Sequence, residues 1–213
     1  LVFFAQALLA CAAPWSSRSR LSVVTMTNGS LLLFGGCCTF NDVWRSDDEG
    51  LSWRSVTAAA SWSARYDVGA LTLSSGSVLV AGGYTGSAYL NDVWRTDNGG
   101  SSWTRIVTAA TWAVRSAHSL VSDSSGGIVL LGGVTTSDVR RNDVWRSSDG
   151  GLSWTQLTSA ASWTARSNVP AVTRSDGAIL LFGGDCSCGV KNDIWISTNL
   201  GASWTQVTSA ATW

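Results

Sequence analysis

A thirteen-residue segment recurs four times along this chain, at residues 41–53, 91–103, 142–154 and 192–204. Each copy begins with Asn-Asp-Val/Ile-Trp, passes through a polar stretch that contains glycine, and ends in Ser-Trp. Two short β-prone runs around such a turn are typical of a β-hairpin. The copies start 50, 51 and 50 residues apart. A constant period of this length predicts a repeat architecture, whatever number of domains 213 residues alone would suggest.

Tryptophan follows the same period. Twelve of the 13 tryptophans fall into four sets of three with a spacing of nine residues, and Trp15 begins the first repeat. The sets are Trp44, Trp53 and Trp62; Trp94, Trp103 and Trp112; Trp145, Trp154 and Trp163; and Trp195, Trp204 and Trp213. Burying one Trp removes about 150–250 Å² from water, which is worth roughly 4–6 kcal/mol as an upper bound. The core is therefore expected to be built on tryptophan.

Each repeat contains four predicted strands. A first strand, such as 67–73 or 168–173, is followed by a polar turn and by an apolar run that closes in Gly-Gly. These runs are LLLFGG at 31–36, VLVAGG at 78–83, IVLLGG at 128–133 and ILLFGG at 179–184. Because the runs are apolar on both faces, they must lie between two other layers. The sequence thus predicts an all-β chain, a β-propeller of four-stranded antiparallel blades, with repeats 15–61, 62–111, 112–162 and 163–213.

The order of these features resembles the kelch repeat in all four copies, over residues 15–213. The turn before the last strand resembles the Asp-box, Ser/Thr-x-Asp/Asn-x-Gly-x-x-Trp. Its residues are Ser46, Asp48, Gly50 and Trp53; Thr96, Asn98, Gly100 and Trp103; Ser147, Asp149, Gly151 and Trp154; and Ser197, Asn199, Gly201 and Trp204. Kelch repeats often carry a His three residues after the Arg that precedes the first strand. Here that His occurs only as His118, and Leu21, Val68 and Val169 stand at the matching places. A single Asp-box carboxylate supplies far fewer oxygens than Ca²⁺ needs, so bonding within its own turn is the favoured interpretation.

Charge and composition argue against several functions. Lys+Arg and Asp+Glu each number 14, and no cluster of cations predicts binding to nucleic acid. A galactose-oxidase-like copper site needs two His, but His118 is the only one; a sialidase-like site needs a Glu base, but Glu49 is the only Glu and lies in an Asp-box turn. The one enzyme activity left to consider is glycoside hydrolysis by paired aspartates, such as Asp67 and Asp123, and it is not favoured. We therefore expect no enzyme activity, no cofactor and no metal.

Four arginines recur three residues after a Trp, at the entrance to the first strand: Arg18, Arg65, Arg115 and Arg166. The kelch resemblance implies that this region lines the mouth of a central channel, where partners bind. The arginines are therefore candidates for a ring that holds carboxylates or sulfates. The favoured alternative is that each pairs with an Asp of its own or the next blade, such as Asp42, Asp92, Asp143 or Asp193.

The tryptophans between repeats are a second set of candidates for ligand binding. Trp62, Trp112 and Trp163 follow short runs of small residues, and Trp213 holds the same place at the end of the chain. If these side chains are exposed, they suit stacking against sugars. If they are buried, they act as wedges between blades, which is the favoured interpretation.

The first residues are apolar and uncharged. Residues 1–13, LVFFAQALLACAA, resemble the apolar part of a secretory signal peptide that ends in Ala10-Cys11-Ala12. Two alternatives are a bacterial lipoprotein signal ending at Cys11 and an apolar segment retained against the propeller or a neighbouring subunit. Segment 1–14 is therefore set apart from the repeats at 15–213. Thirteen residues are too few to span a bilayer, so no membrane span is expected.

Cysteines and a sequon indicate an oxidising compartment. Cys37 and Cys38 follow the first Gly-Gly, and Cys186 and Cys188 follow the fourth, so both pairs lie in the same loop of different repeats. They are disulfide candidates whose connectivity the sequence leaves open: a link between first and fourth blades, or between chains that assemble end to end. Asn28, in Asn-Gly-Ser on a polar turn, is a candidate for N-glycosylation.

These observations predict a secreted or cell-surface, non-catalytic propeller that serves in adhesion or as a self-associating scaffold. Divergence between repeats is confined to the loops at 37–40, 84–90, 134–141 and 185–191. The chain ends at Trp213, the opening Trp of a fifth repeat, which favours further copies of the chain or additional blades as partners. The alternative is a module that binds an extracellular glycan or protein through the Arg and Trp loops.

Overall fold

The computed structural model describes residues 14–37 and 40–212, and these form four antiparallel four-stranded sheets. Blade 1 holds β1 (Ser22–Thr25), β2 (Leu31–Phe34), β3 (Val43–Ser46) and β4 (Arg54–Thr57); blade 2 holds β5 (Gly69–Thr72), β6 (Val78–Tyr84), β7 (Tyr89–Thr96) and β8 (Thr104–Val107). Blade 3 holds β9 (Ser119–Ser122), β10 (Ile128–Leu131), β11 (Val144–Ser147) and β12 (Thr155–Thr158), with a short 3-10 helix at Thr136–Asp138; blade 4 holds β13 (Ala171–Thr173), β14 (Ile179–Cys186), β15 (Gly189–Ser197) and β16 (Thr205–Thr208).

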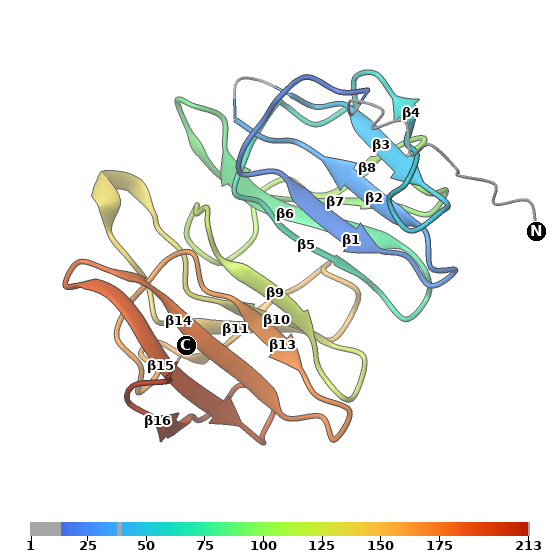
Figure 1. Cartoon of the computed structure of the whole chain (residues 1–213). Coiled ribbons are helices and arrows are strands. Elements are labelled where there is room, and N and C mark those ends of the chain that lie inside the picture. Colours follow the sequence, from blue (N-terminus) through green and yellow to red (C-terminus); the bar gives the residue numbers. More distant parts are fainter. Residues whose placement is uncertain (1–13, 38–39, 213) are drawn as a thin grey trace, which may run out of the picture.

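The blades are arranged around a common centre. The strands of each sheet follow chain order, so the first strand of each blade is an edge strand. Strand β1 packs against β5, β5 against β9, and β9 against β13. Figure 1 shows these four first strands gathered in the middle, with the later strands of each blade fanning outward. The predicted all-β propeller of four-stranded antiparallel blades is confirmed.

Blades 2 and 4 carry longer hairpins than blades 1 and 3. Strands β6 and β7 keep pairing beyond Gly83 up to Tyr84 and Tyr89, and β14 and β15 pair up to Cys186 and Gly189. The register shifts at the Gly-Gly pair in both blades. In these two blades, the divergent segment after Gly-Gly thus forms the tip of the hairpin.

The Gly-Gly pairs allow adjacent blades to approach closely. Gly82 and Gly83 have φ values of +61° and +100°, which side chains with a Cβ rarely adopt. A Cβ on Gly82 would lie 2.8 Å from the carbonyl oxygen of Arg115 in the next blade. These glycines therefore have a structural role, because they allow both the backbone conformation and the close contact between blades.

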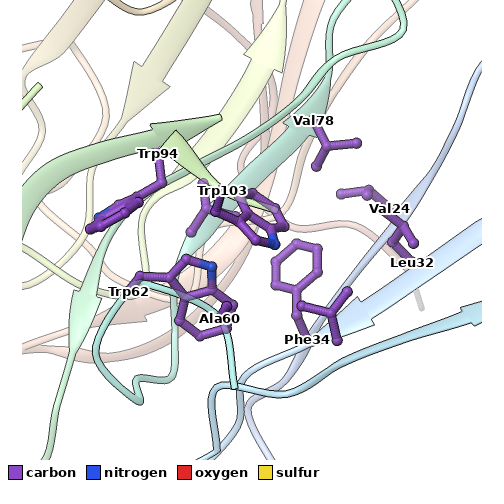
Figure 2. Close-up of a cluster of buried hydrophobic side chains, with 10 residues drawn as sticks. Val24, Leu32, Phe34, Ala60, Trp62, Val78, Trp94 and Trp103 are labelled. Carbon is purple, nitrogen blue, oxygen red and sulfur yellow. The ribbon is translucent and has the colours of Figure 1, made fainter. Parts of the chain in front are cut away.

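Tryptophan wedges fill the spaces between blades. Trp62 is 1% exposed and meets the ring of Trp103 nearly edge-on at 6.0 Å, with Phe34 of blade 1 beside both rings. Figure 2 shows this cluster, in which Leu32 and Phe34 of blade 1 lie beside the tryptophans of blade 2. The pairs Trp112–Trp154 and Trp163–Trp204 repeat the contact at 6.0 and 6.1 Å. The expectation of a core built on tryptophan is therefore correct.

The Asp-box turns use their carboxylates internally. Asp149 accepts hydrogen bonds from the hydroxyl of Ser147 at 2.8 Å and from the backbone N–H and hydroxyl of Ser153 at 2.9 and 2.5 Å. Burial alone would raise the pKa of Asp149, but these hydrogen bonds lower it. Trp154 then donates from Nε1 to the carbonyl of Gly151 at 3.1 Å. The carboxylate thus stabilises its own hairpin, as the sequence predicts.

The two ends of the arc lack the cover that inner blades have. At one position of the first strand, Val24, Leu71 and Val121 are 7–8% exposed, whereas Val172 of the last blade is 50% exposed. Three apolar clusters of described residues join blades 1 and 2, 2 and 3, and 3 and 4. The described residues form no such cluster between blades 4 and 1.

Candidate functional site

The four recurring arginines hold the aspartates of Asn-Asp-Val/Ile-Trp in ion pairs. In blade 3, Arg115 donates from Nη1 and Nη2 to the two carboxylate oxygens of Asp143, both at 2.8 Å. Nη1 also donates to the carbonyl of Gly132 at 2.8 Å. The same pair occurs in the other blades as Arg18–Asp42, Arg65–Asp92 and Arg166–Asp193, each at 2.6 Å. The favoured pairing, with an Asp of the same blade, is confirmed.

The pairs of blades 2, 3 and 4 are also tied to the preceding blade, and all four pairs are closed to ligands. The carbonyl of Arg115 accepts a hydrogen bond from Gly83 N–H of blade 2 at 2.9 Å, and Asp143 accepts one from Trp145 Nε1 at 2.8 Å. Burial alone would raise the pKa of Asp143, but the adjacent Arg115 lowers it. The side chains of Arg18, Arg65, Arg115 and Arg166 are 0–1% exposed. The alternative of a ligand-binding arginine ring is therefore contradicted, because these guanidinium groups are out of reach.

The tryptophans between blades are likewise out of reach. Trp62, Trp112 and Trp163 are each 1% exposed and pack in the three interfaces between blades. They act as wedges, as favoured, and the sugar-stacking alternative is contradicted. Trp213 lies outside the described residues.

His118 lines a central pocket together with residues at the start of the first strand in all four blades. It is 6% exposed, and neither ring nitrogen has a hydrogen-bond partner among the described residues. A Cβ on Gly69 would lie 2.4 Å from its Nε2, so the glycine of blade 2 makes the space for this ring. Burial, assisted by the charge of Arg115 and opposed by that of Asp143, lowers the pKa of His118 to about 3. The imidazole is therefore neutral at physiological pH.

We expect His118 to make stability depend on pH between about 6 and 4. A His with pKa near 6.5 when unfolded and about 3 when folded binds more protons in the unfolded state, so stability falls as pH falls through this window. The slope reaches at most about 1.4 kcal/mol per pH unit. Urea unfolding of wild type and His118→Leu between pH 7 and 4 measures it, and the variant should show a flatter profile. Leu is the residue of blade 1 at this place, Leu21.

The carboxylates cancel in this comparison because both proteins carry them. Asp143, the acidic group that faces His118, has a lowered pKa, so its own contribution is lost only below pH 3.8. Parallel profiles for wild type and His118→Leu would contradict a buried neutral histidine.

A belt of backbone hydrogen bonds runs along the channel mouth from blade 1 to blade 4. Two residues after each kelch arginine, the chain takes a left-handed conformation: Arg20, Asp67, Ala117 and Asn168 have φ of 57°, 52°, 52° and 49°. The N–H of Asp67 donates to the carbonyl of Arg20 at 3.2 Å, that of Ala117 to Asp67 at 2.8 Å, and that of Asn168 to Ala117 at 2.9 Å. The belt therefore fixes equivalent residues of all four blades around one opening.

A polar and aromatic pocket of about 270 Å³ lies at this mouth. The chain contains three tyrosines, and all three line the pocket: Tyr66, Tyr84 and Tyr89. The ring centroids of Tyr66 and Tyr84 are 5.5 Å apart, and those of Tyr84 and Tyr89 are 4.5 Å apart. The remaining lining includes Arg20, Asp67, Asp138, Arg140 and Asp185. This pocket, rather than the arginine or tryptophan sets, is the candidate binding site.

The sequence carried a signal for this pocket in its loops. Tyr84, Tyr89, Asp138, Arg140 and Asp185 all come from the segments in which the repeats diverge. The resemblance to kelch repeats pointed to the mouth but not to these residues. Within the repeat, the periodic residues build the blades and the irregular residues face the opening.

The cysteine pairing is local. Cys186 and Cys188 form a disulfide with an S–S distance of 2.05 Å at the tip of the β14–β15 hairpin. The link between the first and fourth blades is thereby contradicted for this pair. The Sγ of Cys37 lies 3.1 Å from the hydroxyl of Ser19, and Cys38 lies outside the described residues.

Four further predictions concern a glycosylation site, the N-terminal segment, membrane spans and metal sites. Asn28 is exposed on the turn between β1 and β2, where its side-chain oxygen accepts the N–H of Ser30 at 3.1 Å, and its glycosylation stays a prediction. Segment 1–13 lies outside the described residues. Within 14–37 and 40–212, no helix is long and apolar enough to cross a membrane, and no His, Cys, Asp and Glu side chains group as metal ligands.

Comparison with known proteins agrees with the geometry. A family model described as the KLHDC2/KLHL20/DRC7 Kelch-repeats domain matches residues 10–184. No curated protein matches the chain. Kelch propellers mediate protein interactions and are generally non-catalytic scaffolds. With this match over most of the chain, and four sheets carrying the repeated Arg–Asp pair, the protein belongs to the kelch-repeat family of β-propellers.

Proposed function

We propose that this chain is a non-catalytic, protein-binding scaffold that assembles head to tail with a second copy of itself. One observation carries the proposal: the two ends of the arc expose complementary halves of the interface that is used three times inside the chain. A contact between two different surfaces of the same chain closes into a ring or continues as a filament, depending on the rotation it imposes.

The outer face of blade 4 is one half of this interface. Val172 and Val207 are 50% and 57% exposed, and Phe182 and Ile194 are partly exposed. The equivalent residues of blade 3 contact blade 4 or support that contact. Of these, Val121, Leu131 and Val144 are 0–7% exposed, and Leu157 packs against the same cluster. Blade 4 thus carries an apolar face of the kind that another blade covers elsewhere in the chain.

The outer face of blade 1 is the other half. Trp53 is partly exposed, whereas Trp103, Trp154 and Trp204 at the same position are 5–6% exposed. A Cβ on Gly100 would meet Val43 of the preceding blade at 2.8 Å, but one on Gly50 would meet only its own blade. Trp15 already packs edge-on against Trp53 at 4.9 Å, as the inner wedges do. Blade 1 therefore presents the surface that would receive a blade-4 face.

Light scattering on the full chain tests the assembly. The wild type should have a mass above that of one chain, rising with concentration, and Val172→Glu should shift it toward one chain because the charge would be buried in the contact. Leu152→Glu is the matched control, since Leu152 is 54% exposed on an Asp-box turn away from the end face. A wild type that stays at the mass of one chain, or a control that dissociates equally, would overturn the proposal.

An extracellular or cell-surface role in adhesion forms the second part of the proposal. The Cys186–Cys188 disulfide supports it, because disulfides persist mainly in oxidising compartments. Members of the KLHDC2/KLHL20 family are usually intracellular, so this disulfide is the feature that argues for another location. The redox state of both cysteines in protein isolated from its native cells is the direct test. A glycan- or protein-binding site on the Arg and Trp side chains is no longer an alternative, because they are buried.

A further inference from the structure

We propose that the tyrosine-lined pocket at the channel mouth binds the guanidinium group of an arginine that a partner protein presents. The inference deepens the protein-binding function proposed above, but it does not depend on self-association. It names a ligand for the mouth by its chemistry: a planar cation that stacks on tyrosine rings and pairs with carboxylates.

The tyrosines are not needed for the fold. Tyr66 and Tyr84 form a β-bridge just beyond the Gly-Gly pair of blade 2. The same bridge joins Ser116 to Val134 in blade 3. In blade 4 it joins Ser167 to Asp185. Because small or polar residues make this bridge elsewhere, two aromatic rings there serve something other than backbone geometry.

The rings are available and held in place. All three tyrosines are partly exposed, and Tyr84 donates its hydroxyl to the carbonyl of Gly86 at 2.9 Å. Tyr89 completes the group from the far side of the same hairpin, 4.5 Å from the Tyr84 ring. Few side-chain rotamers therefore need to be fixed when a ligand binds, which favours affinity.

The charge of the pocket favours a cation. Three carboxylates line it, Asp67, Asp138 and Asp185, against two guanidinium groups. Arg140 is engaged with Asp138 at 2.9 Å and with Asp185 at 3.0 Å. An anion would meet an excess of carboxylates, whereas a cation would balance them. Burial, together with nearby Tyr84 and Asp138, raises the pKa of Tyr89, which agrees with an electronegative site.

Arg20 of this chain already makes the kind of contact that is proposed for the partner's arginine. Its guanidinium carbon lies 5.4 Å from the centroid of the Tyr66 ring, and Nη1 is 3.2 Å from Asp67. Its side chain is 56% exposed, so this ion pair is weak and leaves room for a partner. A guanidinium between a tyrosine face and a carboxylate is thus an arrangement that this opening already contains.

The size of the pocket points to a single side chain. At about 270 Å³ it is smaller than the roughly 300–1,000 Å³ of typical small-molecule sites. It opens beside the β6–β7 and β14–β15 hairpins, which contain segments in which the repeats diverge. A partner segment could therefore place one side chain in the pocket while its backbone rests on the rim.

Peptide titration of the full chain tests the proposal. The probe is a fluorescently labelled peptide with one Arg flanked by Gly and Ser, compared by anisotropy with the same peptide carrying citrulline, which keeps the shape and removes the charge. We expect the Arg peptide to bind at least about tenfold more tightly, with affinity falling as salt rises.

Two variants locate the site. The double variant Tyr66→Ser with Tyr84→Val copies the pair Ser116 and Val134 of blade 3, so it should fold, and it should weaken binding of the Arg peptide about tenfold. The control is Asp97→Asn. It changes an exposed carboxylate that does not line the pocket, so it should leave binding unchanged. Circular dichroism and light scattering on the same samples report folding and assembly.

Several outcomes would overturn the proposal. These are equal binding of the Arg and citrulline peptides, binding that survives the double variant, tighter binding of a neutral oligosaccharide than of the Arg peptide, or no binding up to millimolar peptide. Since the pocket lies within one chain, each can be seen whether or not the chain self-associates. A failure here is thus distinguishable from a failure of the assembly proposed above.

Discussion

Replacing Arg115 by alanine is expected to lower the free energy of unfolding by about 3–5 kcal/mol, the usual cost of removing one partner of a buried ion pair. In the variant, the carboxylate of Asp143 stays buried without its guanidinium partner. It keeps the hydrogen bond from Trp145 Nε1. It also removes the hydrogen bond to the Gly132 carbonyl, which belongs to the Gly-Gly corner of the same blade. The loss is large because the site is closed to water, so solvent cannot replace the guanidinium.

Urea unfolding followed by tryptophan fluorescence measures this loss. Arg115→Lys should recover only part of it, since an ammonium cannot make the two parallel bonds to Asp143. Arg95→Ala is the matched control, because Arg95 pairs with Asp97 at 3.2 Å on the surface, with side chains 35% and 60% exposed. Its expected effect is below about 1 kcal/mol. Similar losses for the Arg115 and Arg95 variants would show that the buried pair adds nothing special to stability.

Replacing Trp112 by alanine is expected to cost about 3–5 kcal/mol through the cavity it leaves. Trp112 is 1% exposed between blades 2 and 3, where its ring meets Trp154 at 6.0 Å and Leu79 and Leu130 belong to the same cluster. The long side chain beside it, Arg115, is held by Asp143 and the Gly132 carbonyl and so is not free to refill this volume. Blade 3 is therefore expected to lose much of its attachment to blade 2.

The matched control for this variant is built into the repeat. Trp15 occupies the same place in the first repeat but is partly exposed, because no described blade precedes it. At a concentration at which light scattering finds single chains, Trp15→Ala should therefore cost clearly less than Trp112→Ala in the same urea experiment. Equal costs would mean that the wedge does not act by filling an interface.

The architecture was predictable because its signals are local and repeated. Gly-Gly, Asn-Asp-Val/Ile-Trp and the Asp-box each specify a turn or a strand within a few residues, and four copies in register leave little freedom in how strands pair. The pairing of Arg115 with Asp143 could also be favoured from sequence, since both recur with the same period and a buried charge needs a partner. The repeated motifs therefore predict the strands, turns and Arg–Asp pairs that recur in every blade.

The site was harder to predict because it is formed by residues that do not repeat. Tyr66 and Tyr89 are 23 residues apart in the sequence, and Arg20 belongs to another blade, yet they share one pocket. Asp67 has a left-handed backbone conformation, which a glycine would normally indicate in a sequence. Because the residue is an aspartate, the sequence gives no sign of this conformation. Which cysteines pair was equally open, since Cys186 and Cys188 could have been linked elsewhere.

The sequence by itself determined the blades: their number in this chain, their strands, their turns and the tryptophans that hold them. Only the tertiary structure decided which side chains reach solvent, because exposure depends on the neighbouring blade and not on the local pattern. The same position is buried as Val121 and open as Val172. The physical reason is that hydrogen bonding and turn geometry act within a repeat, whereas burial is a property of the space between repeats.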